Sequence, residues 1–485
     1  MVRPVARRRD LSIELAGPDD APVYVRLAAG IVQSVRDGRL RPGAPLPGSR
    51  SLASGLGVHR NTVLAAYGEL QAEGWVATEQ ARGTFVARDL PRRPRAFGSA
   101  PAGPPRRAGF PLPPAVASSH AEYPTRYQLL GGVPDPRLVP VAELARAWRR
   151  ALRHRGHLGY GDVQGHPRLR AAVDGMLAET RGLARGPESV LITRGAQLGI
   201  ALAARALLSP GDAVAVEAFG YRPAWEALQL AGARLVPVPV DAAGLDVAAL
   251  AAVHARERLR AVYLTPHHQY PTTVGLSPAR RLALLDLAAR ERLLVLEDDY
   301  DNEFHYQGRP LLPLASADRA GVVVYVGTLS KSVAPALRLG LVVATPDVVE
   351  RMVAVRRLLD RQGDLVLEAA MAELVEDGVF QRHVWRTRRA YEARQGAMVE
   401  ALQRELGGAL SFQVPSGGMA LWCRTARGID AEAWARRAAA AGVAVQHGRQ
   451  FSFDNRPRNF LRIGFARHTG EEIAEAVRLL AGARG

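Results

Sequence analysis

The segment Val322-Val323-Val324-Tyr325-Val326-Gly327-Thr328-Leu329-Ser330-Lys331 joins a run of β-branched and aromatic residues to a lysine. Lys331 is the only lysine in the chain of 485 residues, and every other member of its 64 Lys and Arg residues is an arginine. Arginine supplies charge but cannot form a Schiff base, because its guanidinium stays protonated, whereas an amine can lose its proton and attack a carbonyl. A solvated lysine without a chemical role is the alternative. The position of Lys331 just beyond an apolar run favours the Schiff-base role.

Similar apolar runs alternate with helical patterns through the C-terminal part of the chain. Buried strands are predicted at 189–193, 213–217, 261–264, 293–296 and 322–326, and helices at 196–208 and 278–292. Continuous apolar strands that alternate with helices are typical of a largely parallel sheet covered on both faces. The predicted fold class of this part is therefore α/β, and a chain of this length is expected to contain more than one domain.

Residues 20–88 have the pattern of a small helical domain that ends in two strands. Helices are predicted from Val25 to near Gly38, at 51–57 and at 61–73, and strands at 75–78 and 84–86. This is the layout of a winged helix-turn-helix. Residues 89–124 are rich in proline and arginine and are predicted to be a semi-extended linker, which either contacts phosphates or is only a solvated tether. Residues 125–485 are predicted to form the second domain.

The composition restricts the location and the partners of the chain. The net charge of +17 points to a polyanionic partner, although arginine-rich proteins can be basic without binding one. The single cysteine, Cys423, excludes an intrachain disulfide and favours a reducing compartment. Acidic residues and prolines follow the basic N-terminus where a signal peptide needs an apolar run, and no stretch is suited to span a bilayer. We expect a cytoplasmic protein with no membrane partner.

Polar and basic residues gather where the second and third predicted helices begin. The candidate DNA contacts are Ser49, Arg50, Arg60, Asn61, Thr62 and Arg82. Free backbone amides and the positive dipole end of the third helix attract phosphate, and side chains there can reach base edges. Arg82, in the wing, is placed to enter a neighbouring groove. The predicted partner is a double-stranded DNA operator, and a protein-interaction module is the alternative.

The motifs of this segment resemble the GntR superfamily of bacterial regulators. They are Leu-Pro-x-Ser-Arg, Leu-Ala, Val-x-Arg-Asn-Thr-Val, Ala-Tyr-x-x-Leu and Gly-Thr-Phe-Val, within residues 46–86. The chain departs from the usual pattern at Gly48, where small polar residues are common, and at His59, where serine is usual.

A Schiff-base lysine needs an aldehyde, and pyridoxal 5'-phosphate (PLP) supplies one. The ring nitrogen of PLP requires an acid that keeps it protonated. Asp298 follows a predicted strand at the edge where α/β folds bind ligands, so we choose it for the ring nitrogen and Tyr300 for the ring hydroxyl. Asp299 is the second choice for the acid. A Mg²⁺ site is the alternative use of these acids, but the downstream lysine favours PLP, and no metal site is assigned.

The phosphate of PLP needs amides and a fixed cation. Gly195, Ala196 and Gln197 link a predicted strand to a helix, so their amides can face an anion. Further candidates are the hydroxyls of Thr328 and Ser330, the guanidinium of Arg338, and Tyr221, which is either a ring-stacking residue or an ordinary core aromatic.

The second domain resembles the fold-type I, aspartate-aminotransferase-like enzymes, which have a large PLP-binding domain and a smaller C-terminal α/β subdomain. The matching motifs are Tyr160-Gly161-Asp162-x-x-Gly165, Asp298-x-Tyr300, Ser330-Lys331, Leu337-Arg338-Leu339-Gly340 and Leu461-Arg462-Ile463-Gly464-Phe465. The resemblance implies that Tyr160 reaches the phosphate across a dimer interface. It also implies that Arg462 holds an effector carboxylate, with a surface salt bridge as the alternative.

The chain departs from the aminotransferase pattern in one loop. Where these enzymes commonly have Asn-Pro-x-Asn-Pro-Thr-Gly, the chain has Thr265-Pro266-His267-His268-Gln269-Tyr270-Pro271-Thr272-Thr273. We expect His268 or Tyr270 to replace the asparagine that contacts the cofactor hydroxyl. This difference argues against efficient transamination more than against cofactor binding.

Together the two halves resemble the MocR/GabR-type regulators. The resemblance implies a homodimer that regulates transcription and uses PLP in its sensor. In the main hypothesis an amino acid or amine displaces Lys331 and forms an external aldimine. In a second version PLP itself is the effector. The alternatives are an active aminotransferase with a DNA-binding appendage, and a structural DNA-binding protein with a relict fold.

Overall fold

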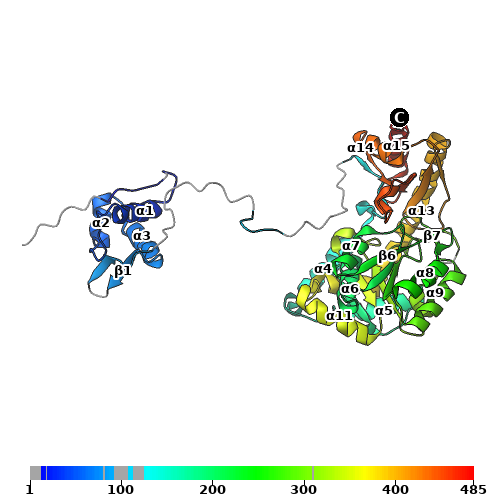
Figure 1. Cartoon of the computed structure of the whole chain (residues 1–485), viewed down its shortest axis with the longest axis horizontal. Helices are drawn as coiled ribbons and strands as arrows, with labels where there is room; N and C mark the ends of the chain where they lie inside the picture. Colours follow the sequence, from blue (N-terminus) through cyan, green and yellow to red (C-terminus); the bar gives the residue numbers. More distant parts are fainter. Residues whose placement is uncertain (1–12, 18, 80–81, 92–107, 113–124, 309–310) are drawn as a thin grey trace, which may run out of the picture. The chain divides into compact units, whose positions relative to one another are not determined.

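The structure, a computed structural model, describes residues 13–17, 19–79, 82–91, 108–112, 125–308 and 311–485. It divides into two compact units, Met1–Val116 and Ala117–Gly485 (Figure 1). Each unit has its own apolar core. Most of the predicted linker, 92–107 and 113–124, lies outside the described residues. Among the helices of the described ranges, none combines the length and the apolar character needed to cross a membrane.

Within its described residues, the N-terminal unit has three helices and a pair of antiparallel strands. These elements are α1 (Val23–Arg36), α2 (Ser49–Leu56), α3 (Arg60–Ala72), β1 (Val76–Glu79) and the antiparallel β2 (Gly83–Val86). Gly57 ends α2 in the left-handed conformation, with φ of 65°, and so allows the sharp turn into α3. Leu27, Ile31, Val63 and Leu70 are fully buried in its core. The predicted winged helix-turn-helix layout is confirmed.

A seven-stranded sheet forms the centre of the C-terminal unit. Its order is β4-β12-β11-β10-β9-β5-β6. The strands are β4 (Val190–Thr193), β5 (Ala213–Glu217), β6 (Arg234–Val238), β9 (Ala261–Leu264), β10 (Leu294–Asp299), β11 (Val323–Thr328) and β12 (Gly340–Val343). β12 is antiparallel to both of its neighbours, and the other neighbouring pairs are parallel. The five strands predicted from the sequence are present, whereas β6 and β12 were not predicted.

Helices cover both faces of this sheet. Alternate strand residues enter two different cores, with Val262 and Val295 in one and Tyr263 and Leu296 in the other. The helices of this part are α4 (Val141–Leu152), α5 (Pro167–Arg181), α6 (Ala196–Leu207), α7 (Arg222–Leu230), α8 (Val247–Glu257), α9 (Pro278–Glu291), α10 (Leu314–Ala317), α11 (Pro346–Leu359) and α12 (Leu365–Glu376). The predicted α/β architecture with a two-sided sheet is confirmed.

The long helix α13 (Val379–Leu406) leads to a smaller C-terminal subdomain (Figure 1). Its sheet has the order β13-β14-β17-β16. The strands are β13 (Leu410–Phe412), β14 (Ala420–Thr425), β16 (Gln446–His447) and β17 (Phe460–Gly464), accompanied by α14 (Ala431–Ala440) and α15 (Gly470–Gly482). Short pairs are formed by β3 (Tyr127–Gln128) with β15 (Val443–Ala444), and by β7 (Val240–Asp241) with β8 (Gly244–Leu245). The β3–β15 pair brings the start of the unit against this subdomain.

Candidate functional site

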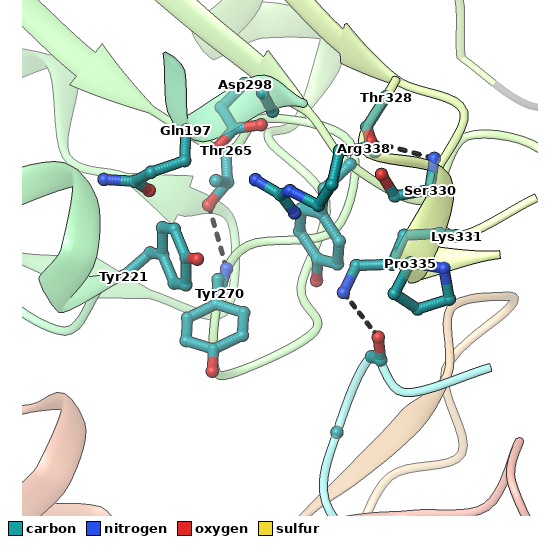
Figure 2. Close-up of a pocket in the computed structure, with 14 residues that line it drawn as sticks. Gln197, Tyr221, Thr265, Tyr270, Asp298, Thr328, Ser330, Lys331, Pro335 and Arg338 are labelled. Carbon is teal, nitrogen blue, oxygen red and sulfur yellow. Dashed lines mark hydrogen bonds between the residues drawn. The ribbon is translucent and has the colours of Figure 1, made fainter. Parts of the chain in front are cut away.

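A cavity lies at the carboxyl ends of the central strands of the large sheet (Figure 2). It is lined by Gly131, Gly132, Ala196, Gln197, Tyr221, Thr265, Tyr270, Asp298, Tyr300, Thr328, Ser330, Lys331, Pro335 and Arg338. These residues come from segments far apart in the sequence, and most of the predicted cofactor residues are among them. Open α/β sheets commonly bind ligands at this edge.

Lys331 follows the end of β11 and reaches into this cavity. Its Nζ donates a hydrogen bond of 2.6 Å to the carbonyl oxygen of Gly132 (Figure 2). Burial lowers the pKa of Lys331 to about 8, and the nearby positive charge of Arg462 acts in the same direction. Because the neutral amine is the nucleophilic form, this site favours attack by Lys331 on a carbonyl.

Asp298 lies near the end of β10 on the cavity face of the sheet. Its Oδ2 accepts a hydrogen bond of 2.7 Å from the hydroxyl of Tyr263. Its Oδ1 is buried and has no hydrogen-bond partner in the described part of the chain. Burial raises the pKa of Asp298 to about 7. The second choice, Asp299, points to the opposite face, where it accepts from the hydroxyl of Tyr325 at 2.8 Å, and it does not line the cavity.

Backbone amides and one arginine form the anion-binding end of the cavity. Gly195, with φ of 82°, precedes α6, so Ala196 and Gln197 occupy the first turn, where amides lack partners within the helix. A Cβ on Gly195 would lie 2.9 Å from Nη2 of Arg338, so glycine leaves space for this guanidinium. The Arg338 guanidinium donates only one hydrogen bond among those found in the described residues, 3.2 Å from Nη2 to the carbonyl of Arg194.

Three tyrosines form the aromatic wall of the cavity. The rings of Tyr221 and Tyr270 are in edge-to-face contact, with centroids 5.3 Å apart. Tyr300 contacts Tyr270 in the same way at 5.9 Å, and its hydroxyl is buried without a hydrogen-bond partner among the described residues. Burial raises the pKa of both Tyr221 and Tyr300, so their hydroxyls remain protonated donors.

The side chains of this cavity match the groups of PLP. An amine, an unpartnered buried carboxyl oxygen and an unpartnered phenol hydroxyl face the same space as a helix N-terminus and an arginine, all within the described ranges. The amine could serve the aldehyde, the carboxyl oxygen the ring nitrogen, and the phenol hydroxyl the ring hydroxyl. The helix N-terminus and the arginine could both serve the phosphate. Thr328 and Ser330 also line the cavity, and the Thr328 hydroxyl accepts a hydrogen bond of 3.1 Å from the Ser330 amide.

Arg462 lies on β17 beside this cavity and is only 1% exposed. Its guanidinium carbon lies 4.2 Å from the ring centroid of Tyr270. Its Nε and Nη1 are buried and have no hydrogen-bond partner in the described ranges. A Cβ on Gly131 would overlap Nη1, so a larger residue there would displace the guanidinium. The surface salt bridge considered as an alternative does not form with any described residue.

Three predicted cofactor residues, Gly195, Tyr160 and His268, do not line the cavity of this chain, although Gly195 directly precedes the lining residue Ala196. Tyr160 is 81% exposed and its ring contacts the guanidinium of Arg361. His268 is buried beside Asp301 and does not line the cavity, whereas Tyr270 does. Of the two candidates for the missing asparagine, the structure therefore places only Tyr270 at the site.

Gly132 and Thr265 are cavity residues that the sequence analysis did not select. Gly132 accepts from Lys331, and Thr265 accepts a hydrogen bond of 2.8 Å from the amide of Tyr270. The pair Gly131-Gly132, close to the predicted start of the second domain, was a signal that could have been used.

The predicted DNA contacts lie around the start of α3 and in the hairpin. Arg60 donates a hydrogen bond of 3.3 Å to the Ser49 hydroxyl, which ties the first turns of α2 and α3 together. Arg50 and Asn61 are exposed and Thr62 is half-buried. Arg82 is exposed and forms a salt bridge of 2.5 Å with Glu79. At position 59, the unusual histidine caps α3, because its Nδ1 accepts from the Asn61 amide at 3.2 Å.

Comparisons with known proteins agree with this division. The bacterial regulatory proteins of the gntR family match residues 23–86, and the aminotransferase class I and II family matches residues 131–480. The chain is 32% identical to the probable rhizopine catabolism regulatory protein MocR of Rhizobium meliloti, over 95% of this chain and 93% of the relative. It is 35% identical to the HTH-type transcriptional regulator TauR of Rhodobacter capsulatus, over 97% of this chain and 98% of the relative.

A solved enzyme resembles the C-terminal unit alone. It is the alpha-aminoadipate aminotransferase LysN of Thermus thermophilus, complexed with N-(5'-phosphopyridoxyl)-L-leucine. The TM-score is 0.68 at 34% identity, over 73% of this chain and 91% of the enzyme. The two regulators instead match nearly the whole chain, including the winged helix-turn-helix. The chain belongs to the MocR-type transcriptional regulators, in which a GntR-type DNA-binding domain precedes an aminotransferase class I and II domain.

Proposed function

We propose that the C-terminal domain of this regulator binds PLP covalently through Lys331 and senses an amino acid. The observation that carries the proposal is that the only lysine of the chain is buried in one cavity with an Asp298 oxygen that has no partner among the described residues. A buried carboxyl without a donor is costly, and a protonated pyridine nitrogen supplies that donor. The solved relative bound to a phosphopyridoxyl ligand supports the same cofactor.

The residues around the cavity then have separate roles. When bound, PLP supplies an aldehyde that forms a Schiff base with a primary amine. Asp298 holds the proton on the ring nitrogen, and Tyr300 donates to the ring hydroxyl. The amides that begin α6, together with Arg338, hold the phosphate, with Tyr221 against the ring. The exposed Tyr160 is the residue that we expect to complete the phosphate site of a second copy in a homodimer.

Arg462 selects the effector. A buried guanidinium with two nitrogens that no described residue satisfies favours an anionic ligand, and a carboxylate is such a ligand. Gly131 lies against the Arg462 guanidinium and the adjacent Gly132 accepts from Lys331, so one small molecule can reach both groups. An amine that carries a carboxylate, that is an amino acid, meets both requirements.

DNA binding is assigned to the first turn of α3. Arg60, Asn61 and Thr62 present donors at a helix N-terminus, and Arg50 adds an exposed cation nearby. An effector that contacts the two states of a dimer differently would change operator affinity.

The test starts from the absorption spectrum of the purified protein, before and after borohydride reduction, with the modified peptide mapped. We expect a yellow protein whose reduced label is on Lys331, and a spectrum that amino acids perturb. If only added PLP changes DNA binding and no amine perturbs the spectrum, PLP is the effector. A colourless protein that takes up no PLP would refute the proposal. Steady-state turnover with pooled amino acids and keto acids would favour the aminotransferase alternative.

A further inference from the structure

Three histidines form a cluster behind the cofactor cavity. His267 and His268 follow β9, and His305 follows β10. One ring nitrogen of each lies within 4.8 Å of those of the other two. The ring centroids of His267 and His268 are 4.4 Å apart, and that of His305 is 6.0 Å from His267. None of these side chains lines the cofactor cavity.

A carboxylate fixes one of the three rings. Nδ1 of His268 lies 2.8 Å from Oδ1 of Asp301, and both side chains are buried. Asp301 orients the His268 ring through Nδ1, and when this ring is neutral with its proton on Nδ1, its Nε2 is an acceptor. Carboxylate–histidine pairs of this kind commonly orient metal ligands.

His267 is buried without any polar partner among the described residues. It is 8% exposed, and neither of its ring nitrogens makes a hydrogen bond in that part of the chain. Buried polar groups normally have a partner, so two unpaired nitrogens on one ring call for a ligand. Burial also favours the neutral imidazole, which is the form that binds metals.

Gly417 and a second cavity border the cluster. A Cβ on Gly417 would lie 2.9 Å from Nε2 of His268 and would overlap the carbonyl oxygen of Phe304, so glycine allows the backbone to pack closely against this ring. His305 is half-buried and lines a second cavity, together with Thr180, Glu303 and Trp385. An ion in that cavity would meet His305 first, because His267 and His268 do not line it.

We propose that His267, His268 and His305 bind one divalent transition-metal ion, with Zn²⁺ as the reference ion, and that a water molecule from the second cavity is the fourth ligand. Three imidazoles and a water are a common ligand set for Zn²⁺. With Zn–N distances of about 2.0–2.1 Å, tetrahedral ligands lie about 3.4 Å apart, so the three rings must move closer on binding. The sequence analysis assigned no metal site, and this proposal is independent of the proposed function.

The ion would join three segments of the C-terminal unit. His305 forms an isolated β-bridge with Gly417, which lies between β13 and β14 of the smaller subdomain. His268 is two residues from Tyr270, and Asp301 directly follows Tyr300. The site would therefore fix two walls of the cofactor cavity relative to the smaller subdomain.

Zinc binding to the full-length, tag-free protein tests the proposal. The protein is stripped with a chelator and titrated with Zn²⁺ in competition with a chromophoric chelator. We expect one tight equivalent per chain, and a tetrahedral Co²⁺ spectrum when Co²⁺ replaces Zn²⁺. His267→Ala and His305→Ala should each weaken binding about 100-fold or more, and Asp301→Asn about 10- to 100-fold.

The control variant is His157→Ala. The Nε2 atoms of His157 and His166 lie 3.2 Å apart, and this outer pair could bind zinc weakly. We expect the tight equivalent to survive in His157→Ala. Loss of the tight equivalent in that variant, its absence from the unmodified protein, or unchanged affinity in His305→Gln would each overturn the proposal. Because His305 is only half-buried, His305→Gln provides this test even if His267→Ala does not fold.

Discussion

Replacement of Arg462 by methionine should weaken amino-acid binding and leave the stability of the protein unchanged or improved. Arg462 is almost fully buried, and two of its nitrogens have no partner among the described residues. The guanidinium is therefore available to an anionic ligand such as a carboxylate. Methionine keeps an apolar side chain of similar length but has neither the donors nor the charge.

The size of both effects follows from the surroundings of Arg462. Two charge-assisted hydrogen bonds at about 1.5–3 kcal/mol each amount to about 3–6 kcal/mol, or a loss of about 10²- to 10⁴-fold in affinity. In the effector-free protein, the unpaired guanidinium costs several kcal/mol of desolvation. The cation–π contact of the guanidinium with Tyr270, at 4.2 Å, stabilises it by only about 0.5–2 kcal/mol. The variant should therefore unfold at the same temperature or higher.

The assay compares an amino acid that perturbs the cofactor spectrum with its decarboxylated amine. Arg462→Met should lose affinity for the amino acid and bind the amine as before. Arg424→Met, which removes an exposed arginine from neighbouring β14, is the control and should bind both ligands normally. Unchanged amino-acid affinity in Arg462→Met would refute the carboxylate role, and a large fall in melting temperature would refute the argument that this charge is unpaired.

Three further predictions concern the cofactor and the operator. Lys331→Ala should lose the borohydride-fixed label but keep basal DNA binding, because the proposed DNA contacts lie in the other unit; undiminished colour would contradict the assignment. The pKa of Lys331 is lowered to about 8 in the cofactor-free protein, so the neutral fraction of its amine grows as the pH rises through 8. The rate of PLP attachment, measured by stopped flow, should therefore increase with pH and then level off. A flat profile between about pH 6 and 9 would contradict this prediction. Arg60→Ala should weaken operator binding by about 1–3 kcal/mol at fixed salt. The charge-matched control is Arg290→Ala, which removes an exposed arginine from the other unit. Equal losses of operator affinity in both variants would show that Arg60 contributes only non-specific charge.

The sequence predicted the parts of the fold in which local pattern and burial agree. The bounds of β5 and β9 coincide with two predicted apolar runs. β12 was not predicted, because its four residues follow directly on the segment that carries Arg338, and their pairing with β4 and β11 depends on residues elsewhere in the chain. The choice of Asp298 over Asp299 agrees with strand alternation, which places the two carboxyls on opposite faces.

The less predictable part of the site depends on contacts across long separations. His268 and Tyr270 are equally plausible in sequence, and only the path of the loop places Tyr270 in the cavity and His268 against Asp301. Gly131 lies next to Arg462, which is far away in the sequence, so the need for glycine at that position could not be seen before the fold was known. The histidine cluster similarly joins residues that follow two different strands.

The sole lysine also determines how the chain can coexist with a reactive aldehyde. Free PLP condenses with accessible amines, and a protein with many surface lysines would acquire scattered adducts that compete with its specific site. Among the side chains of these 485 residues, one amine exists, and it is buried in the cofactor cavity. Every arginine on the surface gives positive charge for polyanions without offering a second attachment point. Each chain can therefore carry PLP on one side chain or on none. After reduction, a mass increase equal to one PLP adduct reports that attachment.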